Sequence, residues 1–141
     1  MKLGRAAAAV ILGLMVFASC AIYSSWKKQR DVKELLKRVR IECLGYSQVH
    51  DDGIMPDTWD DLVKAGMINQ SLADQWAARV ELQSGLYQAD NRTALLAWSR
   101  SGRNWIAITA GGAFVELSDD QLAARRRKLD KHSESFIQPA N

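Results

Sequence analysis

Two cysteines and two histidines are the first side chains to consider as a nucleophile and a general base in this 141-residue chain. Cys20 lies in an uncharged apolar segment, and Cys43 lies on the apolar face of an expected helix. His50 and His132 stand in polar sequence. A thiol becomes reactive when a nearby base or positive charge lowers its pKa, and no nucleophile, base and orienting residue follow one another in a supporting motif. We therefore predict no catalytic residue and a protein that is not an enzyme.

A run of aspartates beside His50 has the oxygen chemistry of a metal site. Its members are Asp51, Asp52, Asp57, Asp60 and Asp61. Calcium needs about six to eight oxygen ligands that converge on one point, and this spacing matches no ligand loop. Turn formation and the capping of a helix N-terminus explain the same residues. The sequence therefore predicts no metal ion and no cofactor.

Trp98 and Trp105 fall in adjacent expected strands, where they could pair as a platform for a sugar or a base. Packing in a small hydrophobic core is the other use for such large side chains, and we favour it. The formal net charge of +3 falls to +1 once Lys2 and Arg5 are assigned to the N-terminal segment. A nucleic-acid-binding domain carries a marked basic excess. We therefore predict no nucleic-acid partner, and we identify no small-molecule substrate.

Residues 1–23 have the pattern of a membrane anchor or a signal segment. After Lys2 and Arg5, residues 6–23 carry no charge. A helix of about 18 residues reaches about 27 Å, close to the roughly 30 Å hydrocarbon core of a bilayer. Aromatic and basic residues follow at the depth where lipid headgroups would lie. These interface residues are Tyr23, Trp26, Lys27 and Lys28. We therefore expect membrane lipids to be partners.

Two other uses of the same segment stay open. Lys2, Arg5 and residues 6–18 also fit the basic and apolar regions of a cleaved secretory signal. Phe17-Ala18-Ser19-Cys20 resembles the lipobox of bacterial lipoproteins, which implies lipidation at Cys20 and a domain on the outer side of the membrane. The basic residues that follow the segment favour the cytoplasmic side by the positive-inside rule, taken alone.

Residues 24–47 show the apolar period of an amphipathic helix. Six residues form one stripe, which consists of Val32, Leu35, Leu36, Val39, Cys43 and Tyr46. No helix breaker separates Tyr23 from Asp31, so the anchor should continue into this helix over about 40 residues and about 60 Å. We expect the stripe to pack across a sheet, or to make helix–helix contacts with a partner protein.

The remaining sequence predicts one α+β domain over residues 24–141. Short apolar runs separated by glycine turns indicate an antiparallel meander of three or four strands. Capping signals mark a short helix before the meander and another helix after it. We expect the short helix at 57–66, the meander at 78–117 and the C-terminal helix at 119–131.

Particular residues define the ends of these two helices. Asp57 or Thr58 is expected to cap the first helix, and Gly66 is expected to end it. Ser118 and Gln121 have the spacing of a capping box at the start of the second helix.

Local strings in this order resemble type IV pilins and type II secretion pseudopilins. The stretch from Tyr46 to Pro56 is similar to the region where the spine helix of those proteins ends. Residues 72–77 resemble a turn of the family with the pattern Asp-Pro-Trp-Gly, and residues 111–117 resemble a late glycine turn and strand. The resemblance implies a first helix that is half membrane anchor and half spine, followed by a small antiparallel sheet.

The prepilin peptidase signal of that family is not matched here. The signal has a Gly followed by Phe, with a Glu four residues beyond the Phe. In this chain Arg5 follows Gly4, and Ala9 stands at the position of the Glu. Incorporation into a filament by the usual salt bridge to a neighbour's N-terminus therefore does not follow from the resemblance.

These features together predict a membrane-anchored, non-enzymatic structural or interaction protein that is pilin-like in fold. We expect its domain on the periplasmic or outer side of a bacterial inner membrane. Protein partners would bind through the N-terminal helix, as part of a secretion or surface assembly. The alternatives are a lipoprotein adaptor held through Cys20 and a small ligand-binding module that uses Trp98 and Trp105.

Overall fold

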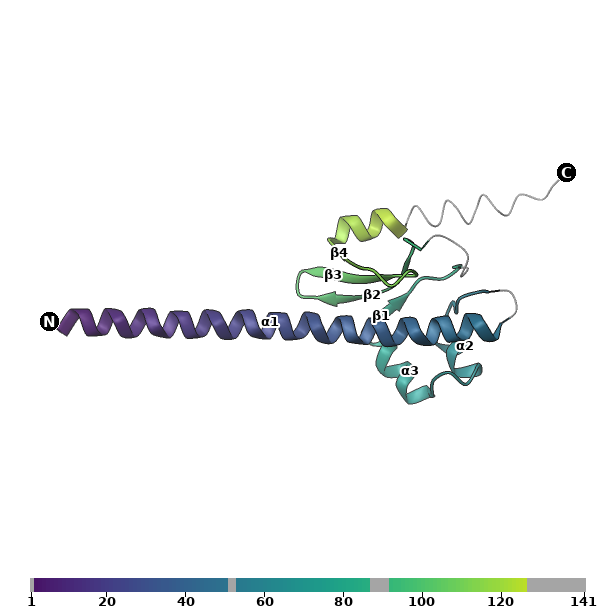
Figure 1. The fold of residues 1–141 in the computed structure, drawn as a ribbon, viewed down its shortest axis with the longest axis horizontal. Coiled ribbons are helices and arrows are strands. Elements are labelled where there is room, and N and C mark those ends of the chain that lie inside the picture. Colours follow the sequence, from purple (N-terminus) through teal and green to yellow (C-terminus); the bar gives the residue numbers. More distant parts are fainter. Residues whose placement is uncertain (1, 51–52, 87–91, 127–141) are drawn as a thin grey trace.

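One unbroken helix, α1 (Lys2–Val49), extends through the domain and far beyond it (Figure 1). It is 48 residues long, and the computed structural model describes residues 2–50, 53–86 and 92–126. No proline interrupts α1, and a glycine inside a helix costs only about 1 kcal/mol relative to alanine. The prediction that the apolar segment continues into the amphipathic helix is confirmed.

Four antiparallel strands form one sheet in the described part of the chain. They are β1 (Val80–Leu82), β2 (Leu95–Ser101), β3 (Asn104–Thr109) and β4 (Phe114–Leu117), side by side in that order. Gly102 in the β2–β3 turn and Gly112 before β4 have φ angles of 61° and 92°. Glycine adopts this left-handed conformation without the clash of a Cβ. The expected meander, and with it the α+β class, is confirmed.

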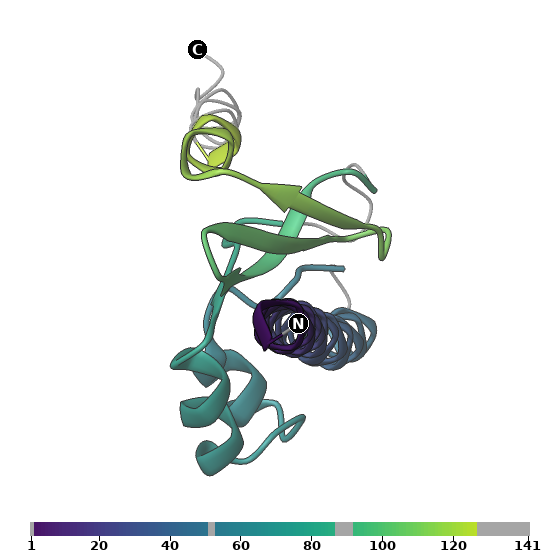
Figure 2. The same cartoon turned by 90° about the vertical axis from the view of Figure 1, so that its left-hand side faces the viewer.

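The domain is built around α1, which lies between the sheet and two short helices (Figure 1, Figure 2). Helices α2 (Trp59–Lys64) and α3 (Gln70–Ala77) pack on the side of α1 away from the sheet. A helical segment at 119–126, called the terminal helix below, covers the opposite face of the sheet. Residues 127–131, the rest of the expected C-terminal helix, lie outside the described residues.

Helix α3 occupies the segment for which the pilin resemblance implied a turn. Asn69 caps this helix, because its side chain accepts a hydrogen bond of 2.8 Å from the backbone N–H of Leu72. Ala73 and Trp76 are buried on its inner face. The implied turn was wrong, since Gln75 stands where the family pattern has proline and leaves the helical hydrogen bonds intact.

Helix α2 is shorter than the expected range of 57–66. Thr58 is its N-cap, and Thr58 and Asp61 form a capping box. Asp57 accepts a hydrogen bond of 2.6 Å from the backbone N–H of Gly85 and so ties the start of α2 to a distant loop. Gly66 has a φ of 73° just beyond the helix, as a C-terminal glycine should.

Each face of the sheet carries a hydrophobic layer. A β-bulge between Leu95 and Ala97 breaks the alternation of β2, so that Leu96 and Ala97 both join the layer against α1. The other layer contains Trp98 and Leu117, and Leu122 of the terminal helix is buried against it. The layer against α1 is the larger of the two and fixes the position of that helix.

Candidate membrane-facing site on helix α1

The first half of α1 is apolar and uncovered. Its residues 6–28 are exposed along their whole length, and the domain begins to cover α1 only after them. Within the described residues, this is the single helix that is long and apolar enough to cross a membrane. The thiol of Cys20 lies exposed on this part of the helix, which continues through Cys20 without a break. A retained anchor and a lipidated Cys20 therefore remain distinct proposals.

Aromatic and basic side chains follow the apolar half directly. The rings of Tyr23 and Trp26 lie 6.4 Å apart between centroids, and the guanidinium carbon of Arg30 lies 5.7 Å from the centroid of Trp26. Lys27 and Lys28 are exposed, and neither makes an ion pair in the part of the chain that is described. Amphipathic rings beside free cations are typical of the interface between lipid and water.

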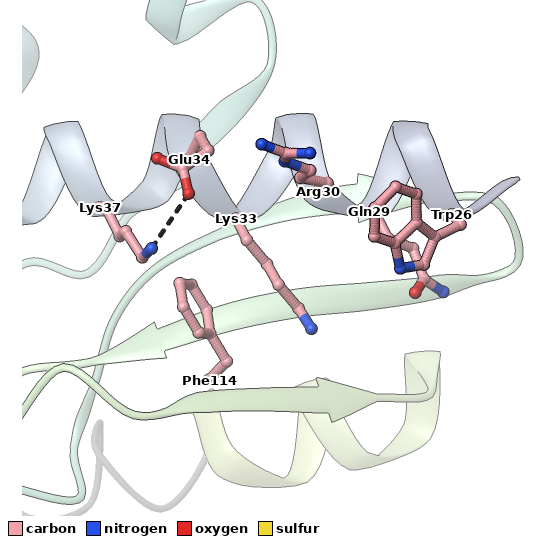
Figure 3. Close-up of a pocket in the computed structure, with 7 residues that line it drawn as sticks. All are labelled: Trp26, Gln29, Arg30, Lys33, Glu34, Lys37 and Phe114. Atoms are coloured by element: carbon pink, nitrogen blue, oxygen red, sulfur yellow. Dashed lines mark hydrogen bonds and ion pairs between the residues drawn. The ribbon is translucent and has the colours of Figure 1, made fainter. Parts of the chain in front are cut away.

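A groove lies directly above this belt, between α1 and the start of β4 (Figure 3). Its volume is about 200 Å³, and its lining consists of Trp26, Gln29, Arg30, Lys33, Glu34, Lys37 and Phe114. The Lys33 ammonium lies 5.7 Å from the centroid of the Phe114 ring. One of the three cations is neutralised, because Lys37 makes an ion pair of 3.0 Å with Glu34. The hydrogen bond from Lys37, followed by the charge of Lys37, lowers the pKa of Glu34. This carboxyl group therefore stays ionised.

The six-residue stripe predicted on α1 lies under the chain's own sheet. Val32, Leu36, Val39 and Cys43 are buried, and Leu35 and Tyr46 are half-buried around them. These side chains belong to the larger hydrophobic layer, together with residues from β2 and β3. Helix–helix contact with a partner through this stripe would require the sheet to leave it.

Cys43 is enclosed in that layer, and this decides its chemistry. Burial, followed by the negative charge of Glu42, raises the pKa of the thiol from 9.0 to about 12. A thiol that stays protonated near neutral pH is a poor nucleophile. Cys43 therefore acts as a small apolar core residue in this fold.

We expect the Cys43 thiol to resist maleimide at pH 8 in the folded chain and to react rapidly after denaturation. The Cys43 thiol keeps its proton in the folded chain, whereas the unfolded chain releases it near pH 9. The contribution of the protonated thiol to the free energy of unfolding is therefore fully present below pH 9. It is lost as the pH rises towards 12. Peptide mapping by mass spectrometry after timed labelling separates Cys43 from Cys20. Fast native labelling at Cys43 would show that the thiol is open to solvent.

The register of the sheet bears on the alternative in which Trp98 and Trp105 pair as a ligand platform. Trp98 is opposite Ala107, and Trp105 is opposite Arg100 and Leu117. The two-residue turn between β2 and β3 sets a register in which the two tryptophans are not directly opposite each other. Both side chains pack in the smaller hydrophobic layer of the sheet, which is the use that we favoured.

The two rings also have separate polar partners. The Trp98 indole N–H donates to Glu81 at 3.0 Å, and the Trp105 indole N–H donates to Asp119 at 2.7 Å. Trp98 is buried and Trp105 is half-buried, with Arg100 over its ring at 5.0 Å. The hydrogen bond from Trp105, followed by that from Arg100, lowers the pKa of Asp119. Trp98 therefore links β2 to Glu81 of β1, and Trp105 links β3 to Asp119 of the terminal helix.

Two described members of the acidic run, Asp57 and Asp61, have structural partners. Burial of Asp61 acts to raise its pKa, but hydrogen bonds from Thr58 and the backbone N–H of Asp57 outweigh it, and the pKa is lowered. The exposed His50 ring stacks on Tyr46, with centroids 4.0 Å apart. No group of three or more metal-ligating side chains occurs in the described ranges. Asp51, Asp52 and His132 lie outside these ranges.

No protein-family model, no curated protein and no solved structure matches this chain. The groove above the anchor must therefore be judged on its own geometry. Sequence reasoning had placed Tyr23, Trp26, Lys27 and Lys28 at the interface and Arg30 in the basic run that follows them, but it missed Phe114 as a neighbour of this belt. The spacing of Trp26, Arg30, Lys33 and Lys37 on one helical face was the available signal for the helical wall of the groove.

Proposed function

We propose that this chain is a single-pass membrane protein that presents a non-enzymatic α+β domain at a fixed distance from the bilayer. The observation that carries the proposal is the continuity of α1. The same helix supplies the exposed apolar segment and, a few turns later, the buried Leu36 and Val39 of the core. A domain built on its own anchor cannot swing on a flexible linker, so its height and orientation are set by the helix.

The role that fits this construction is structural or interactive, within an assembly of pilin-like proteins in a bacterial inner membrane. The element order supports it, because a spine helix under an antiparallel meander is what the pilin resemblance implied. The sheet occupies the stripe on α1, so protein partners would bind along the uncovered anchor half of the helix. We place the domain on the periplasmic or outer side.

We expect the full-length chain to stay in native membranes through an alkaline carbonate wash, because its uncharged helix remains in the hydrocarbon core. The intact mass of the washed protein is the second measurement. An unshortened mass supports a retained anchor, and a mass that starts at an acylated Cys20 supports the lipoprotein adaptor. A mass lacking residues 1–4 would revive the filament hypothesis. Release into the wash would refute the membrane proposal.

A further inference from the structure

We propose that the groove above the anchor binds the phosphate headgroup of an anionic phospholipid, with Arg30 and Lys33 as its cationic ligands. This inference rests on the proposed function, because it requires a retained membrane anchor. It adds a lipid class and a site to that function.

The depth of the groove matches that of the headgroups. The apolar segment ends at Tyr23, and the helix rises about 1.5 Å per residue, so the Cα atom of Arg30 lies about 10 Å further out and that of Lys33 about 15 Å. The interfacial layer on each side of a bilayer is roughly 5 to 7 Å thick. Side chains on a helix tilt towards its N-terminus, here the membrane side, and long ones reach back by about one turn, or about 5 Å. Arg30 can therefore reach the phosphate layer, whereas Lys33 reaches back only to about 10 Å, roughly 3 to 5 Å above that layer, and binds a headgroup that rises into the groove.

The side chains in the groove are placed for such a ligand. Figure 3 shows Lys33 crossing the groove from α1, with its ammonium on the Trp26 side of Phe114. Trp26 forms the membrane-side wall, and its ring lies beside the Arg30 guanidinium. Lys37 is further from the bilayer and already paired with Glu34. The two cations nearest the membrane are therefore the two that remain for a phosphate.

The charge around the groove favours an anion at this end. Among the described residues, Arg30 and Lys33 make no ion pair, and the exposed Lys27 and Lys28 lie on the membrane side of them. The acids in this stretch of α1 are Asp31, which is exposed, and Glu34, which Lys37 neutralises. Each cation near an anionic surface contributes roughly 1 kcal/mol, or about fivefold in affinity.

The hydrophobic part of a lipid has a path that continues from the groove. Ile22 and Tyr23 lie one turn before Trp26 on the same helical face, and both are exposed. Phospholipid acyl chains beside this face would bury apolar surface that nothing in the described chain covers. A free phosphate would gain none of this contact, which is why we assign the groove to a phospholipid.

Native mass spectrometry of the full-length chain can test the assignment. The chain is released from nanodiscs that contain equal amounts of phosphatidylglycerol and phosphatidylcholine, and the bound lipids are counted. We expect the unmodified chain to retain phosphatidylglycerol preferentially. Arg30→Gln combined with Lys33→Gln should reduce this preference about 25-fold. The matched control, Arg38→Gln with Lys64→Gln, removes two exposed cations far from the bilayer and should keep it.

Three outcomes would overturn the lipid site. They are equal retention of both lipids by the unmodified chain, an unchanged preference in the groove variant, or an equal loss in the control. Arg30→Lys keeps the charge and should keep most of the preference, which guards against a loss caused by misfolding. The alkaline wash of native membranes distinguishes failure of the anchor proposal from failure of the lipid-site proposal. A chain that is released refutes the anchor and this site together, and a chain that stays without lipid preference refutes only the site.

Discussion

Leu36→Asp is expected to abolish the folded domain. Leu36 has no exposed surface and lies at the centre of the layer between α1 and the sheet. Truncating a buried leucine costs about 2 to 5 kcal/mol, and an unpaired carboxylate in an apolar core adds several more. Domains of this kind are stable by roughly 5 to 15 kcal/mol in total. The substitution should therefore lower the free energy of unfolding to near zero or below it.

The measurement is thermal unfolding of the full-length chain in nanodiscs, followed by tryptophan fluorescence and by limited proteolysis. Ile41→Asp is the matched control, because Ile41 lies on the same helix with 62% of its surface exposed. We expect Ile41→Asp to change stability by less than about 1 kcal/mol. If Leu36→Asp left a normal transition, the sheet would not cover the stripe, and the stripe would be open to a partner helix.

The continuity of α1 and the glycine turns could be predicted because both are local. A periodic apolar stripe without proline defines a helix, and glycine at positions such as Gly102 and Gly112 defines a turn. Helix α3 was missed although it too has a local signal. It has only eight residues, half of them polar, and its cap at Asn69 is its clearest local signal. A degenerate family pattern was given more weight than that cap.

The register between β2 and β3 could have been derived from the length of the turn that joins them, a step that the sequence analysis did not take. A two-residue turn that pairs Ser101 with Asn104 places Ala107, and not Trp105, opposite Trp98. The bulge beside Leu96 is not visible in the sequence, because it depends on how β2 fits against α1. The register is therefore inferred more safely from the length of the turn than from the types of side chain in the two strands.

The groove could be predicted only in part, because one wall comes from a distant strand. The helical wall has a local signature, in which Trp26, Arg30 and Lys33 share one face of α1. Phe114 reaches Lys33 only through the packing of β4 beside β3 and of the sheet on α1. The basic residues after the anchor could be recognised early, but their arrangement as a site depends on the tertiary fold.

Trp98→Ala is expected to destabilise the domain by about 3 to 5 kcal/mol, which corresponds to a fall of roughly 10 to 20 °C in Tm. Trp98 is one of the largest fully buried side chains, and its indole N–H donates to Glu81. Arg126 of the terminal helix lies over the ring at 5.5 Å and pairs with Glu81 at 3.6 Å. Removing the ring leaves a cavity and also takes away the surface on which the terminal helix packs.

Two further variants separate packing from ligand binding. Trp98→Phe keeps most of the apolar volume and loses the hydrogen bond to Glu81, so it should cost only about 1 to 2 kcal/mol. Trp26→Ala removes an exposed ring outside the core and should leave the Tm of the domain almost unchanged. A ligand platform would require the opposite order, with Trp98→Ala tolerated and its fluorescence in the unmodified chain strongly quenched by acrylamide. Because the Trp98 ring fills the layer between the sheet and the terminal helix, a ligand could reach its face only after that helix had left the sheet.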